Sequence, residues 1–163
     1  MFKSFGDLPL HVLVIHAAVV VLPVAGLVAI AFVLVPKWRW LLRWPTAILG
    51  VGSFVLAFVA KQSGLAFLKA KPALQQLIAE HEKRGNLLFW YALIFAVITI
   101  VAALLLPGPS ALASGRGAKT GGMRPLEIVV SAGVVVMSVL LVWQTIRTGD
   151  AGARAVWTGT LTS

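Results

Sequence analysis

The residues of this chain best suited to chemistry are two histidines and a glutamate close to the apolar segments. His16 lies roughly two helical turns inside the first apolar segment, and His81 precedes the third. Ionisable groups inside a membrane are costly and usually face the interior of the helix bundle. Two imidazoles from facing helices can ligate haem b axially or, together with Glu82, bind a transition metal. The sequence therefore suggests a cofactor site at His16 and His81, with Glu82 as a further metal ligand.

Other polar residues are expected at the same membrane face. The chain has four apolar segments. If all four cross the membrane, one face holds the start of the first and third segments and the end of the second and fourth. His11 precedes His16 by five residues, about 140° around a helix, so one metal held by both is not expected. The candidate supporting residues at this face are His11, Gln62, Ser63, Arg147, Asp150 and Arg154.

A simpler interpretation needs no cofactor. Intramembrane polar residues often hold helices together by hydrogen bonds. His16 would then bond to a backbone carbonyl or to Ser63 within the bundle, while His11 and His81 would lie at the membrane surface. The residue pattern alone favours this simpler interpretation over the paired ligands.

Composition indicates a membrane protein. Of 163 residues, 60% are hydrophobic and only 12% charged, with a mean hydropathy of +0.96; soluble domains carry about a quarter charged residues. The net charge of +9 is spread over short clusters between apolar runs, which favours anionic lipid headgroups as partner and not nucleic acid. Cysteine is absent, which excludes disulfides and thiolate sites.

The hydrophobic pattern predicts an all-α integral membrane bundle of four transmembrane helices in a single domain. Runs of about 20 apolar residues can cross a bilayer as helices, and the expected spans are about 8–35, 45–62, 86–106 and 125–147. The second span is the shortest. Residues 107–124, rich in glycine and serine, predict a flexible loop. The residues from Pro72 onward have helical periodicity and predict an amphipathic extension before the third span.

Charge and aromatic residues indicate an orientation. The loops after the first and third spans contain basic residues and no acidic ones, whereas the opposite side has more basic residues in total but mixes them with acidic ones. The total count and the density in short loops therefore disagree. The density favours a cytoplasmic location for both loops, with both termini outside. Tryptophan and tyrosine prefer the headgroup level. One interface is expected at Trp38, Trp40 and Trp44, and the other at Trp90, Tyr91 and Trp143.

Several short motifs together resemble a known family. They are Leu8-Pro9-Leu10-His11 with Val14-Ile15-His16, Gln62-Ser63-Gly64, Glu80-His81-Glu82 with Gly85, and the glycine-rich segment 149–157. In this order they resemble the actinobacterial branch of a family of small four-helix bacterial membrane proteins classed as a domain of unknown function. The resemblance implies a bacterial cytoplasmic membrane location and importance for His11, His16 and His81, but it implies no reaction.

Two further functional interpretations remain open. The chain contains no Walker loop and no HExxH, GxSxG or GxGxxG motif, so nothing in the sequence points to an enzyme. A non-catalytic accessory subunit of a larger membrane complex, such as a respiratory one, is the alternative to a cofactor protein. Its apolar faces would pack against a membrane-protein partner or a second copy of the chain. A transport role would require an oligomer.

Overall fold

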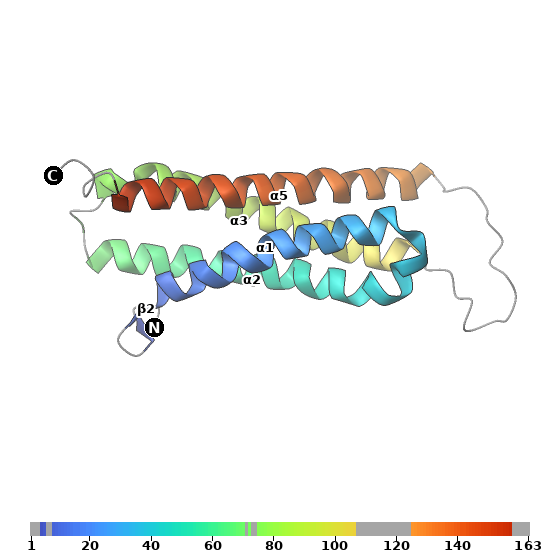
Figure 1. Cartoon of the computed structure of the whole chain (residues 1–163), viewed down its shortest axis with the longest axis horizontal. Coiled ribbons are helices and arrows are strands. Elements are labelled where there is room, and N and C mark those ends of the chain that lie inside the picture. Colours follow the sequence, from blue (N-terminus) through green and yellow to red (C-terminus); the bar gives the residue numbers. More distant parts are fainter. Residues whose placement is uncertain (1–3, 6–7, 71, 73–74, 107–124, 158–163) are drawn as a thin grey trace, which may run out of the picture.

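The computed structural model describes residues 4–5, 8–70, 72, 75–106 and 125–157, and it is an all-α bundle of four long helices (Figure 1). Helix α1 covers Leu10–Leu34 and α2 covers Arg39–Ala70, with the short 3-10 helix η1 at Pro36–Trp38 between them. Helix α3 covers Gln75–Leu105 and α5 covers Pro125–Trp157. The two-residue strands β1, Ser4–Phe5, and β2, Leu8–Pro9, form a small antiparallel hairpin before α1.

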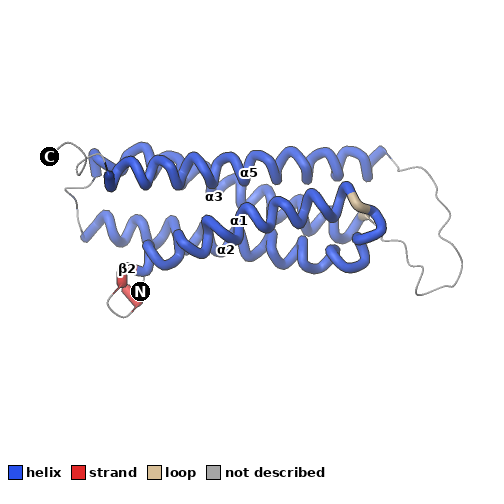
Figure 2. The backbone as a smooth tube through the Cα atoms, viewed as in Figure 1, coloured by secondary structure: helices blue, strands red, loops and turns tan. Residues whose placement is uncertain are grey.

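The helices run alternately up and down, and each packs mainly against its two neighbours in a ring. Contacts join α1 to α2, α2 to α3, α3 to α5 and α5 back to α1 (Figure 2). Helix α1 therefore begins, and α5 ends, at one end of the bundle, which we call the histidine end because His11 and His81 lie there. The opposite end, with η1, is called the arginine end for Arg39 and Arg43.

All four helices are long and apolar enough to cross a membrane, and the chain is a multi-pass membrane protein. Their most apolar windows have mean hydropathies of 2.8, 1.6, 2.6 and 2.4. The second value is the lowest, but α2 has 32 residues, about 48 Å of helix, against a hydrocarbon core of about 30 Å. The predicted fold class and the existence of the weakest span are thus confirmed.

The helices extend further than their apolar runs. Helix α2 starts at Arg39 and continues to Ala70, whereas the apolar run predicted a span of about 45–62. The predicted amphipathic extension belongs to the same helix as the third span, α3. The helices continue past the hydrocarbon boundary because charged and polar residues such as Lys, Glu and Gln also favour helix formation in water. The predicted flexible loop, 107–124, lies outside the described residues.

Glycines allow close approach where helices cross. A side chain at Gly50 of α2 would collide with the Thr99 hydroxyl of α3, and a Cβ at Gly26 of α1 would lie 2.9 Å from Val142 of α5. Small residues at such crossings allow backbones to come close in membrane bundles. Phe32, Phe95, Leu22 and Leu141 fill the core between these crossings, all with at most 1% of their surface exposed.

Two arginines of α2 complete the C-terminal turns of α1 and α3. The carbonyl of Phe32 would normally accept from the residue four positions on, but that residue is Pro36, which has no N–H. Buried Arg39 donates from Nε to the Phe32 oxygen at 3.3 Å. In the same way Pro107 offers no N–H to Ala103, and Arg43 donates to the Ala103 oxygen at 2.6 Å.

Candidate functional site

His11 is held at the start of α1 by the backbone of α2. Its Nδ1 lies 3.0 Å from the Ala60 carbonyl oxygen and 3.2 Å from the Ser63 hydroxyl. A carbonyl can only accept, so Nδ1 carries the proton and Nε2 keeps a free lone pair. The ring packs over Gly64, where a Cβ would come within 3.0 Å of its Cε1. The missing side chain of Gly64 thus makes room for the imidazole.

His81 is held on α3 in the same manner, but by α5. Its Nδ1 lies 3.0 Å from the Thr148 carbonyl oxygen, so this nitrogen also donates and Nε2 is again free. A Cβ at Gly152 would lie 2.9 Å from His81 Nδ1. The glycine-rich segment after the fourth span therefore has a structural explanation: one of its glycines is the surface on which the His81 ring rests.

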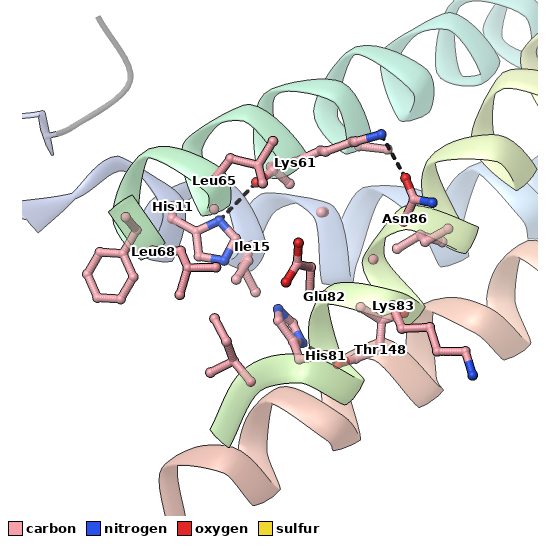
Figure 3. Close-up of a pocket in the computed structure, with 18 of the residues that line it drawn as sticks. His11, Ile15, Lys61, Leu65, Leu68, His81, Glu82, Lys83, Asn86 and Thr148 are labelled. Atoms are coloured by element: carbon pink, nitrogen blue, oxygen red, sulfur yellow. Dashed lines mark hydrogen bonds between the residues drawn. The ribbon is translucent and has the colours of Figure 1, made fainter. Parts of the chain in front are cut away.

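The two rings meet in one cavity at the histidine end. Their centroids are 6.2 Å apart and their planes are inclined by 77°. Figure 3 shows the Nε2 side of each ring directed towards the other, with Glu82 beside them. The cavity has a volume of about 460 Å³ and is lined by all four helices, mostly by apolar residues. Pockets of about 300–1,000 Å³ with a few converging polar groups are typical small-molecule and cofactor sites.

The expectation that His16 faces the bundle interior is corrected by the structure. His16 is exposed, on the same face of α1 as Val20 and Leu27, which are 63% and 64% exposed. Its Nδ1 lies 2.7 Å from the Val12 carbonyl oxygen of its own helix. The ring therefore has a hydrogen-bond partner without turning into the bundle interior. His16 does not line the cavity, so the structure brings together His11 and His81 instead of His16 and His81.

The other predicted site residues divide into two groups. Ser63 is buried and contacts His11, and Glu82 lines the cavity. The remainder do not line it. Asp150 and Arg154 form an exposed ion pair with each other at 3.0 Å, and the exposed Arg147 lies over the Trp143 ring at 5.6 Å; Gln62 is half-buried on α2.

Three protein ligands for a bare metal do not come together in the described part of the chain. No group of three or more His, Cys, Asp or Glu residues there has the geometry to hold a metal ion. The predicted ligand set of His16, His81 and Glu82 is therefore not assembled. Two nitrogen donors remain, those of His11 and His81.

Sequence reasoning missed a polar pair on the cavity wall. Lys61 of α2 donates from Nζ to Asn86 Oδ1 of α3 at 2.7 Å, and its ammonium lies 4.6 Å from the centre of the Phe89 ring. Both Lys61 and Asn86 line the cavity (Figure 3). Their spacing in the sequence, 25 residues, gives no signal by itself, because only the α2–α3 pairing makes them neighbours.

Comparisons of the chain with protein-family models, with curated proteins and with solved structures found no match. The class of the protein therefore rests on its own fold and site. It is a multi-pass membrane four-helix bundle with two imidazoles in an apolar cavity at one end.

Proposed function

We propose that the protein binds haem b through His11 and His81 and transfers single electrons at one membrane surface. The paired imidazoles carry this proposal. A histidine nitrogen lies about 2 Å from the metal that it binds and about 1 Å from the centre of its own ring. Two histidines on opposite sides of one metal would therefore have ring centres about 6 Å apart. The observed separation is 6.2 Å. Cofactor sites in helix bundles are commonly built in this way, from side chains on facing helices.

The hydrogen bonds of the two rings support a ligand role. Metal-ligating histidines almost always donate their second N–H to a carbonyl or carboxylate, which fixes the tautomer and the ring orientation. His11 and His81 both do so, to the Ala60 and Thr148 carbonyls. What separates these two rings from His16, whose Nδ1 also bonds a carbonyl, is that both line one cavity.

Haem suits the donor set better than a bare metal ion. A bare zinc or copper site commonly needs three or four protein ligands, and among the described residues only two converge. A porphyrin would bring four nitrogen ligands of its own, so His11 and His81 would hold its iron with the two nitrogens that it still lacks. The mostly apolar lining of the cavity also suits a flat apolar macrocycle.

The site lies near the membrane surface. His11 and His81 are each about 35 Å along their helices from the arginine end, slightly more than the thickness of the hydrocarbon core. A redox cofactor at this depth is accessible to a partner in the adjacent aqueous compartment. The carrier role therefore requires no path through the bundle.

The test is the absorption spectrum and metal content of the detergent-purified protein, expressed with haem precursor and metals available. We expect a Soret band and about one haem per chain. His11→Ala and His81→Ala should each abolish the six-coordinate spectrum, because each removes an axial ligand. His16→Ala is the matched control: it removes an exposed histidine from the same helix as His11 and should leave the spectrum unchanged.

Three results would count against the proposal. A colourless protein without stoichiometric metal would give the histidines structural roles and favour the accessory-subunit function, with a search for a membrane partner as the next step. Loss of the band in His16→Ala together with its retention in His11→Ala would restore the pairing suggested by the sequence. Stoichiometric zinc or copper without haem would replace haem by a bare metal.

A further inference from the structure

The cavity opens along the seam between α2 and α3. Nearly all of its exposed lining residues belong to these two helices, including Leu65 of α2 and Gln75, Glu82 and Asn86 of α3. His11 from α1 and Thr148 from α5 form the opposite wall. A flat ligand that reaches both imidazoles would therefore present one edge to this seam.

Lys61 of α2 and Asn86 of α3 join the two helices across this seam, on the side nearer the middle of the bundle. The lysine lies one turn of α2 before Leu65, and its ammonium is held by the Asn86 oxygen and by the face of the Phe89 ring. An ammonium has three donors, and only one is used by Asn86. The Asn86 amide has two more N–H donors. The pair thus offers several donors and a positive charge on two residues that line the cavity.

We infer that Lys61 and Asn86 bind a carboxylate on the edge of the ligand in this cavity, which under the proposed function is a propionate of haem. A carboxylate accepts hydrogen bonds only, and bonds between charged partners are roughly twice as strong as neutral ones. Lys61 is half-buried between apolar helix faces. Salt therefore screens the attraction between its ammonium and such an anion less than it would at a fully exposed lysine. The inference rests on the proposed function and adds the orientation of the ligand.

The experiment compares two porphyrins. Protein prepared without haem is titrated in detergent with haem b and with haem b dimethyl ester, which has the same iron and macrocycle but no free carboxylates. We expect Lys61→Met to weaken haem b binding about tenfold and to change binding of the ester less than twofold. Lys61→Arg should retain near-normal haem b affinity, because it keeps the charge and the donors.

Lys69→Met is the control for charge in general. Lys69 is exposed in the last turn of α2 and does not line the cavity, so its removal should leave both affinities unchanged. Equal weakening of both porphyrins by Lys61→Met would overturn the inference, since it would indicate a structural role for Lys61. Unchanged binding of both would overturn it as well. Failure of the wild-type protein to bind either porphyrin would refute the proposed function, and the inference with it.

Discussion

At the scale of single residues, two glycines determine whether the imidazoles can occupy their positions. A Cβ at Gly152 would lie 2.9 Å from His81 Nδ1, closer than such atoms normally approach, and a Cβ at Gly64 would lie 3.0 Å from His11 Cε1. The nearest atoms belong to rings whose own position is fixed by a hydrogen bond to a carbonyl. An added methyl group would therefore act directly on ligand geometry.

We expect Gly152→Ala to lower haem affinity at least tenfold, because the His81 ring would be displaced from the Thr148 carbonyl. The measurement is a haem titration followed by the Soret band. Gly52→Ala is the control, since a Cβ at Gly52 meets nothing within 4 Å and Gly52 lies outside the cavity lining. Undiminished affinity in Gly152→Ala would show that the ring can shift without loss, and would contradict this account of the glycine-rich segment.

The residue scale is also where prediction from the sequence was least complete. The sequence identifies the histidines and places His11 and His16 on different faces of α1, but it predicts the inner face for His16 and a supporting role for His11. The assignment assumed that an ionisable group in a membrane must turn inward. His16 instead satisfies its ring with the Val12 carbonyl of its own helix and remains outside. Lys61 and Asn86 could not be paired without knowing how α2 and α3 face each other.

At the scale of helices, prediction was more successful because hydrophobic run length is a direct physical requirement of the bilayer. All four helices were expected, including α2, whose apolar run is the shortest. The ends of the helices do not follow from the apolar runs, because each helix continues into water through polar residues that carry no hydrophobic signal. The use of Arg39 and Arg43 to replace the N–H groups missing at two prolines depends on contacts between helices, and so was not visible in the sequence.

We expect Arg39→Met to destabilise the bundle by about 1–3 kcal/mol, the cost typical of leaving a buried polar group unsatisfied. The variant would remove the donors to the Phe32 and Val33 carbonyls. Unfolding of the purified protein by heat or by denaturing detergent would measure the change. Lys37→Met, which removes an exposed basic residue in the adjoining η1, should stay within about 0.5 kcal/mol of wild type. Equal effects of the two variants would show that charge, and not capping, matters here.

At the scale of the whole molecule, the two ends of the bundle differ in chemistry. The histidine end carries the cavity and its carboxylate and amide groups, whereas the arginine end carries Arg39 and Arg43 with exposed Trp38, Trp40 and Trp44. Such a division means that a cofactor in the cavity would serve only one of the two aqueous compartments. Which compartment this is follows from the orientation of the chain in the membrane.

The basic, acid-free loops at the arginine end predict that this end is cytoplasmic and that the histidine end faces the outside. The natural chain has no cysteine, so single-cysteine variants report without background. Gln76, exposed in the first turn of α3, and Lys37, exposed in η1, lie at opposite ends of the bundle. In intact cells a membrane-impermeant maleimide should label Gln76→Cys, and should label Lys37→Cys only after the membrane is permeabilised. The reverse pattern would place the cavity, and with it the proposed haem site, on the cytoplasmic side, and any electron-transfer partner would then have to be sought there.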